Sequence, residues 1–167
     1  VSNMINAGCY VFNREVIADI PANEVVSVER QVFPELIAAN KKVMGYIESA
    51  YWLDIGTPTT LMKGSKDLVT GLADGAALDR YKFAHRSPEF ISLSQNVSGR
   101  ITGGSSIGAH CQIINCEIEG SIISDGVEAE DCTIINSFIE IGAKLPTSSR
   151  IENAYVDPDG EISAYPK

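Results

Sequence analysis

The pattern of apolar and polar positions changes once along the chain, near residue 88. Before that point short apolar runs, at 4–12 and 43–49, alternate with stretches of helical spacing, at 14–20 and 58–70. This alternation is typical of an α/β domain. After it, isoleucines recur every six residues with glycines between them, a period that no helix explains. The chain is therefore predicted to consist of two structurally different parts.

A strand that ends at Trp52 is predicted to present one carboxylate, that of Asp54, at its carboxyl end. Gly56 allows a tight turn after it, Thr57 can cap a helix, and Pro58 fits the first helical position. Open α/β sheets bind ligands at this end of their strands, which makes Asp54 a candidate functional residue. The alternative interpretation is that Asp54 only begins a loop.

The elements around this stretch are too few for a complete sheet. Asn13 is expected to cap a helix over 14–20, Ser27 to begin another helical stretch, and Pro34 to interrupt it before a fresh helical turn. With strands only at 4–12, at 43–49 and before Asp54, the part cannot close a doubly wound sheet. We therefore expect some of that sheet to come from elsewhere.

The period of six, seen at Ile101, Ile107 and Ile113, predicts a left-handed parallel β-helix of hexapeptide repeats. Residues 111–119 and 132–140 also match at an offset of 21, with six of nine positions identical. Three hexapeptides make a coil of about 18 residues, so this offset suggests one coil plus about three inserted residues. In that register Cys111 lies beneath Cys132 and Glu119 stacks with Glu140. The two sulfurs are then either buried thiols or a disulfide.

Composition adds boundaries and exclusions. The expected domains are 1–70 (α/β), 71–88 (a linker rich in Gly, Ala and Asp) and 89–167 (the β-helix). A net charge of −9 without basic clusters argues against nucleic acid as a partner. No apolar run approaches the roughly 20 residues that cross a bilayer, so we expect no membrane span and a cytoplasmic protein. The acidic stretch 117–140 is interpreted as solvated surface.

Three motifs in this order, NAGCYVF, SVERQVFPEL and YWLDIGTP, followed by hexapeptide repeats, resemble the C-terminal part of a sugar-1-phosphate nucleotidyltransferase. The resemblance covers the whole chain and implies the C-terminal portion of a Rossmann-like nucleotidyltransferase domain. It is greatest to mannose-1-phosphate guanylyltransferases, which implies GTP and mannose 1-phosphate as substrates and GDP-mannose and pyrophosphate as products. A glucose-1-phosphate adenylyl- or thymidylyltransferase is the alternative.

The resemblance also implies roles for particular residues. The Asp of the family's W-x-D-x-G motif binds the metal, Mg²⁺, and here that position is Asp54. Asn6, Gly8 and Tyr10 match the strand that lines the sugar-phosphate pocket, and Glu29 lies on the segment that closes it. The amide of Asn6 can bond sugar hydroxyls in both directions, and Gly8 leaves room for the ring.

The family's glycine-rich nucleotide loop, its second metal-binding Asp and its Glu-Lys-Pro motif have no counterpart in this sequence, so we expect the chain alone to be inactive. Two other functions remain open. A hexapeptide acyltransferase would use His110 as general base. A non-catalytic assembly or regulatory module would use the β-helix to join subunits. This function is compatible with the nucleotidyltransferase one, and we expect a homo-oligomer through residues 90–165.

Overall fold

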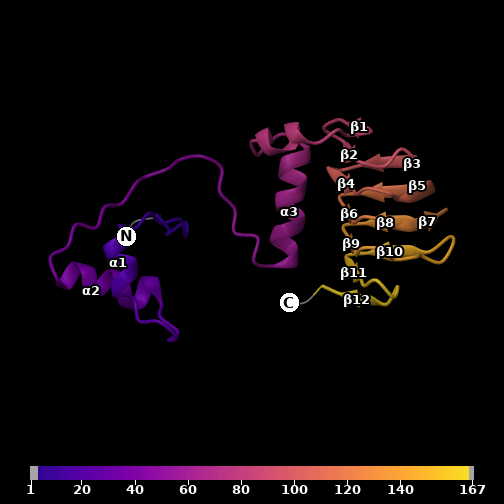
Figure 1. Ribbon diagram of the computed structural model, residues 1–167. Helices are drawn as coiled ribbons and strands as arrows, with labels where there is room; N and C mark the ends of the chain where they lie inside the picture. Colours follow the sequence, from indigo (N-terminus) through magenta and orange to yellow (C-terminus); the bar gives the residue numbers. More distant parts are fainter. Residues whose placement is uncertain (1–3, 166–167) are drawn as a thin grey trace. The chain divides into compact units, whose positions relative to one another are not determined.

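A computed structural model describes residues 4–165 of the chain (Figure 1). It contains two compact units, which divide between Trp52 and Leu53. Each unit is described by itself below. Within residues 4–165, no helix has both the length and the apolar character that a bilayer crossing requires.

The first unit holds short helical elements. Helix α1 spans Arg14–Asp19, a π-helical turn η1 spans Val28–Val32, and α2 follows directly at Phe33–Ala38. The Ser27 hydroxyl accepts from the backbone N–H of Arg30 at 3.2 Å, while the Ser27 N–H donates to the Gln31 side chain at 2.8 Å. This reciprocal capping starts the turn where the sequence predicts it. Pro34 lies in the first turn of α2, as expected.

The strands predicted at 4–12, at 43–49 and before Asp54 are wrong for this structure. These segments contain no strand residues within the described part of the chain. A strand exists only through hydrogen bonds to a neighbouring strand, and within residues 4–165 these segments are not paired with one. Their apolar side chains remain exposed, with Val11 99% and Tyr46 88% accessible. The local sequence pattern is strand-like, but no neighbouring strand in the described part of the chain pairs with these segments.

The second unit begins with a long helix and continues as stacked strands. Helix α3 spans Pro58–Val69, and a 3₁₀ turn η2 spans Ala76–Arg80. The strands are β1 His85–Arg86, β2 Phe90–Ser92, β3 Val97–Thr102, β4 Ser105–Ile107, β5 Gln112–Glu119, β6 Ile122–Ile123, β7 Glu128–Glu130, β8 Thr133–Ile135, β9 Phe138–Ile139, β10 Arg150–Glu152, β11 Ala154–Val156 and β12 Ile162–Ala164. Figure 1 shows them as successive layers of one column.

The pairing defines a parallel β-helix, which confirms the predicted fold class. One sheet runs β2-β4-β6-β9-β11 in parallel, and a second runs β10-β8-β5-β3, with β7 beside the first half of β5. Antiparallel strands β1 and β12 close the two ends of the first sheet. Because an antiparallel strand cannot continue the coil, each one ends the stack on that face and covers its edge.

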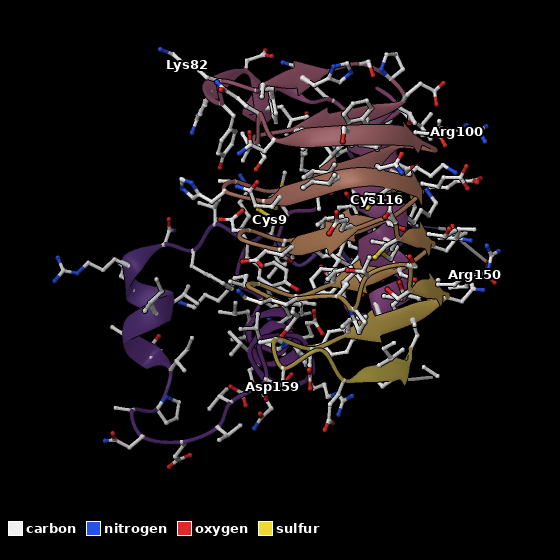
Figure 2. The ribbon with its side chains drawn as sticks, turned by 90° about the vertical axis from the view of Figure 1, so that its right-hand side faces the viewer. Cys9, Lys82, Arg100, Cys116, Arg150 and Asp159 are labelled. Carbon is white, nitrogen blue, oxygen red and sulfur yellow. The ribbon has the colours of Figure 1, made fainter. Side chains whose placement is uncertain are left out.

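Inward side chains form three columns, one on each face of the coil. They are Val97, Ile113, Ala129 and Leu145; Ile101, Ile118, Ile134 and Ile151; and Ile107, Ile123, Ile139 and Val156. Most of these side chains are fully buried and make up the core. Figure 2 shows the outward side: Arg100 and Arg150 project from the same face, because Glu117 and Thr133 link them in register.

The coil is shorter than the predicted 18 residues. Ile118 pairs with Ile134 at an offset of 16, and Ile134 pairs with Ile151 at 17. The sequence offset of 21 is therefore the sum of one coil of 16 residues and a step of 5 residues to the next face. The repeat in the sequence thus matches residues that lie on two different faces of the coil. The predicted stacking of Cys111 with Cys132 is wrong. So is that of Glu119, which pairs with Ile135 rather than Glu140.

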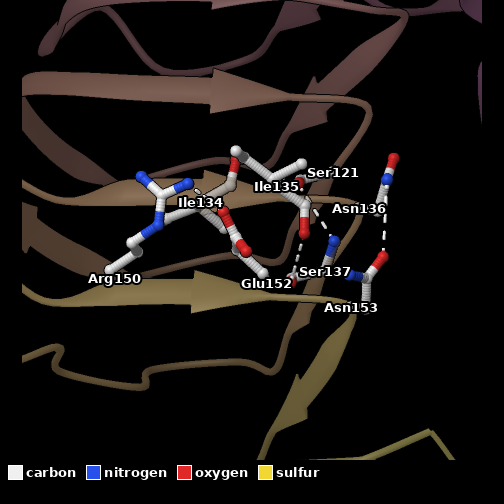
Figure 3. Close-up of polar contacts among 8 residues, drawn as sticks. All are labelled: Ser121, Ile134, Ile135, Asn136, Ser137, Arg150, Glu152 and Asn153. Atoms are coloured by element: carbon white, nitrogen blue, oxygen red, sulfur yellow. Dashed lines mark hydrogen bonds and ion pairs between the residues drawn. The ribbon is translucent and has the colours of Figure 1, made fainter.

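Each corner of the coil uses a residue in the left-handed conformation followed by a small buried residue. One corner contains Gly120 (φ 54°), Asn136 (45°) and Asn153 (50°), which precede Ser121, Ser137 and Ala154. The Ser121 hydroxyl accepts from the Ser137 N–H at 3.1 Å, and the Ser137 hydroxyl accepts from the Ala154 N–H at 3.2 Å. Figure 3 shows the Ser121–Ser137 step of this ladder beside the Asn136–Asn153 contact. The corners thus satisfy buried backbone donors from one coil to the next.

Helix α3 packs against β4 of the β-helix. Ser65 on the helix and Ser106 on β4 place their hydroxyl oxygens 3.2 Å apart. The predicted domain limits, 1–70, 71–88 and 89–167, stay a prediction. Within the second unit, however, α3 is structurally part of the β-helical assembly.

Candidate functional site

Three of the residues predicted to bind a sugar phosphate lie in one hydrogen-bonded cluster of the first unit. The Tyr10 hydroxyl donates to Glu29 Oε1 at 2.6 Å. The Asn6 side-chain amide lies 2.7 Å from the Tyr10 oxygen and donates to the same Glu29 oxygen at 3.0 Å. Residues separated by 19 and 23 positions in the sequence therefore meet at one carboxylate oxygen.

Gly8, the fourth predicted residue, fixes the orientation of Asn6. Its backbone N–H donates to Asn6 Oδ1 at 3.0 Å, which leaves the Asn6 NH₂ group to face Tyr10 and Glu29. Gly8 has φ 71°, a conformation that residues with a side chain rarely adopt. A Cβ at Gly8 would meet nothing within 4 Å, so the space beside it is open. The turn at Gly8 thus presents the polar cluster beside an open surface.

Aromatic packing holds Tyr10 in place. Its ring meets that of Phe33 edge to face, with centroids 5.1 Å apart, and lies 6.0 Å from Phe12. Phe12 and Phe33 stack on each other at 5.9 Å. Such contacts orient a ring without consuming its hydroxyl. Sequence reasoning did not identify Phe12 and Phe33 as residues that support the cluster. The available signal was their position close to predicted site residues, since Phe12 is two residues after Tyr10 and Phe33 is four residues after Glu29.

The electrostatics of the cluster favour a neutral Tyr10. The hydrogen bond to the Glu29 carboxylate raises the pKa of the Tyr10 hydroxyl above its usual value, and loss of hydration adds to the effect. Tyr10 consequently acts as a hydrogen-bond donor near neutral pH. Asn6 and Glu29 are both exposed, so the cluster is accessible from solvent.

Asp54 belongs to the second unit and precedes α3. Its Oδ1 accepts from the Gly56 N–H at 2.9 Å, which forms a tight turn. Thr57 then caps the helix reciprocally with Thr60, and Pro58 occupies the first turn, as the sequence predicts. The Asp54 side chain is exposed. Its place directly before a capped helix is thus confirmed, while its role as a metal ligand stays a prediction.

The donor chemistry of Asp54 suits one ligand of a hard cation such as Mg²⁺. One carboxylate oxygen is engaged by Gly56, and the other can coordinate a metal. Among residues 4–165, no group of three or more His, Cys, Asp or Glu side chains gathers in a way that could hold a metal ion. Asp54 can therefore contribute to a metal site but cannot form one with these residues alone.

His110 has a structural explanation. It occupies a left-handed corner of the coil with φ 59°, where Gly126 and Gly142 stand in the following coils. Its side chain is exposed.

The polar cluster at Glu29 in the first unit, and the carboxylate turn before a capped helix and a parallel β-helix in the second, are the features that the sequence resemblance leads us to expect. Comparison with known proteins agrees: residues 1–71 match the nucleotidyl transferase family. The predicted resemblance to the C-terminal part of a sugar-1-phosphate nucleotidyltransferase is thereby confirmed.

Individual relatives extend the similarity into the β-helix. Mannose-1-phosphate guanylyltransferase of Mycobacterium tuberculosis is 41% identical over 138 residues, which cover 80% of this chain and 37% of the relative. Probable mannose-1-phosphate guanylyltransferase 3 of Oryza sativa is 29% identical over 160 residues (93% and 39%). Glucose-1-phosphate adenylyltransferase of Bacillus cytotoxicus is 28% identical over 181 residues (96% and 46%). The chain spans less than half the length of each of these relatives.

Proposed function

We propose that this chain supplies the sugar-phosphate-binding segment and the β-helix of a mannose-1-phosphate guanylyltransferase. The observation that carries the proposal is the convergence of Asn6, Tyr10 and Glu29 on one network. That network lies inside the segment that matches the nucleotidyl transferase family. The substrates are GTP and mannose 1-phosphate, and the products are GDP-mannose and pyrophosphate.

In this reaction an oxygen of the sugar 1-phosphate attacks the α-phosphorus of GTP, and pyrophosphate leaves with the electrons of the broken P–O bond. Glu29 accepts hydrogen bonds from sugar hydroxyls, and Asn6 and Tyr10 hold its carboxylate in place. Asp54 contributes one oxygen to Mg²⁺, which when bound neutralises charge on the phosphates. The chain lacks a glycine-rich nucleotide loop, so it is inactive by itself.

The test uses a longer polypeptide that joins this chain to the nucleotide-binding part of the family's catalytic domain. We expect it to form GDP-mannose from GTP and mannose 1-phosphate, and Glu29→Gln to raise the KM for the sugar phosphate. The matched control is Glu35→Gln, which changes an exposed carboxylate in the first turn of α2. Equal KM values in the two variants would remove Glu29 from the sugar site.

The alternative substrates belong to the same reaction class. Relatives named glucose-1-phosphate adenylyltransferase are 27–28% identical to this chain, against 41% for the mycobacterial guanylyltransferase. The higher identity supports mannose 1-phosphate and GTP over glucose 1-phosphate with ATP or dTTP. Competition among these pairs in the longer polypeptide decides the question; preferential turnover of glucose 1-phosphate would reject the mannose assignment.

An acyltransferase is the less supported function. His110 occupies a corner that requires a left-handed backbone conformation, and glycine adopts this conformation as well. We expect His110→Gly to keep the stability and the nucleotidyl transfer of the longer polypeptide. Acetyl transfer from acetyl-CoA that is lost in His110→Gly would favour the acyltransferase instead.

We further propose a cytoplasmic homo-oligomer that assembles through residues 90–165. Four free cysteines among the described residues suit a reducing compartment. Among the described residues β10 is the last strand of its sheet, and its outer edge is a surface on which a second copy can pair. Light scattering at high protein concentration is expected to give a multiple of 18.0 kDa. A mass of one chain would contradict the assembly.

A further inference from the structure

The segment around Asp54 folds back onto the middle of α3, at Gly64. A Cβ placed on Gly64 would lie 3.3 Å from Ile55 Cγ2 and 3.4 Å from Leu53 Cδ2. The two side chains that flank Asp54 in sequence therefore rest on the bare backbone of one helical turn. Any side chain at Gly64 would press on both of them.

The carboxylate of Asp54 is constrained on its other side as well. Gly56 donates its N–H to Asp54 Oδ1, and a Cβ on Gly56 would lie 3.1 Å from that oxygen. The reciprocal cap between Thr57 and Thr60 then joins this turn to the helix. The segment 53–57 is thus held at two points of α3, at its first turn and at Gly64.

The opposite side of α3 contacts the β-helix. Ser65, the residue after Gly64, faces Ser106 on β4. At the next residue of the helix, a Cβ on Gly104 would lie 2.7 Å from Lys66 Cγ, so helix and coil corner approach as closely as a glycine allows. Adjacent residues of α3 therefore contact the Asp54 segment and the coil, and α3 connects the two.

We propose that Gly64 is a positioning residue for Asp54, and that α3 fixes the Asp54 carboxylate relative to the β-helix. The proposal rests on the proposed function, in which Asp54 binds Mg²⁺. Mg²⁺ demands nearly ideal octahedral geometry, with ligands at about 2.0–2.1 Å. A methyl group at Gly64 requires the Ile55 side chain to move by a few tenths of an ångström, and a shift of that size, passed on to the adjacent Asp54, is large on that scale.

If Gly64 positions Asp54, the substitution Gly64→Ala should stabilise helix α3 and weaken the binding of Mg²⁺. Glycine inside a helix is less favourable than alanine, so Gly64→Ala favours α3 itself. A residue with only a structural role would therefore leave the site unchanged or more stable when replaced. If Gly64 is a positioning residue, its replacement by alanine instead stabilises the helix and disturbs the Asp54 turn.

The first measurement uses this chain. We expect hydrogen exchange at the Gly56 amide to become several-fold faster in Gly64→Ala, because its acceptor, Asp54 Oδ1, is displaced. The control is Thr59→Ala, which raises helix propensity at an exposed position of α3. Unchanged exchange at Gly56 in Gly64→Ala would overturn the positioning role.

The second measurement uses the longer polypeptide defined above. Calorimetric titration with Mg²⁺ is expected to give a several-fold weaker affinity in Gly64→Ala and an unchanged one in Thr59→Ala. Equal Mg²⁺ affinity in Gly64→Ala and the parent would reject the proposal. Asp54→Asn separates the two hypotheses: full Mg²⁺ affinity in that variant removes Asp54 from the metal site, whereas the Gly56 exchange result stands independently.

Discussion

Cys116 and Cys132 lie side by side on neighbouring coils, each directly after a left-handed corner residue. Asn115 precedes the first and Asp131 the second, and their side chains bond at 2.6 Å. Both thiols donate to the backbone carbonyl two residues earlier, at 3.3 and 3.2 Å. Ser121 and Ser137 do the same at another corner. These cysteines therefore occupy the same structural position as the serines, in which the side-chain sulfur or oxygen hydrogen-bonds to a backbone carbonyl of the corner.

This position predicts the reactivity of the four thiols. Cys9 is exposed, whereas Cys111, Cys116 and Cys132 are buried. Burial raises the pKa of the Cys111 and Cys116 thiols, which lowers the fraction of reactive thiolate. In the absence of a reductant, we expect one thiol of the native protein to react rapidly with a thiol reagent, and all four thiols to react in denaturant. Cys9→Ser is the control and should abolish the rapid reaction; fewer than four thiols after unfolding would indicate a disulfide.

The serine ladder predicts a loss of stability for Ser121→Ala. The Ser121 hydroxyl accepts from the buried N–H of Ser137, and without it that donor has no partner. An unsatisfied buried donor costs about 1–3 kcal/mol, and urea unfolding measures the loss. Ser121→Cys is the matched control, because Cys132 fills the same kind of position. A loss no smaller for cysteine than for alanine would contradict the ladder.

The period of the β-helix shows how far sequence reasoning reaches. Ile101, Ile107 and Ile113 repeat every six residues, and this suffices to predict the coil. The length of a coil does not follow from this period, because the step from one inward side chain to the next varies between four and six residues along the coil. All three corners also use the same left-handed and small-residue pair. A repeat between 111–119 and 132–140 therefore matches two faces, and only the hydrogen-bonded register identifies neighbours.

Close contact between α3 and a coil corner predicts unequal effects of two glycine substitutions. Gly104 and Gly142 have similar positive φ angles, 78° and 73°. Alanine at either position pays the left-handed backbone cost of about 1–2 kcal/mol. At Gly104 the new methyl group would also overlap Lys66, which adds about 1–3 kcal/mol, whereas at Gly142 it meets nothing within 4 Å. Equal unfolding free energies for the two variants would show that α3 does not pack at this corner.

The candidate site was predictable only in part. Asn6, Gly8, Tyr10 and Glu29 were found through the family resemblance, and the structure brings them together. The strands predicted at 4–12, at 43–49 and before Asp54 are absent from the described residues. A strand forms only with a pairing partner, which a local sequence pattern does not reveal. The packing of Leu53 and Ile55 on Gly64 was not predicted either, since a glycine inside a helix carries no signal of what packs on it.

The Tyr10–Glu29 bond predicts how Tyr10 titrates. The carboxylate stabilises the neutral hydroxyl, so the pKa of Tyr10 in the folded chain lies above its unfolded value. The stabilisation is thus complete below the unfolded pKa of about 10 and is lost as the pH rises through the folded pKa. In Glu29→Gln the charge disappears, and we expect Tyr10 to ionise at lower pH than in the parent. Absorbance at 295 nm, compared with Tyr10→Phe to isolate one ring, measures the shift. Glu35→Gln is the control and should leave the titration of Tyr10 unchanged; an equal change in both variants would mean that general charge, rather than this hydrogen bond, sets the pKa of Tyr10.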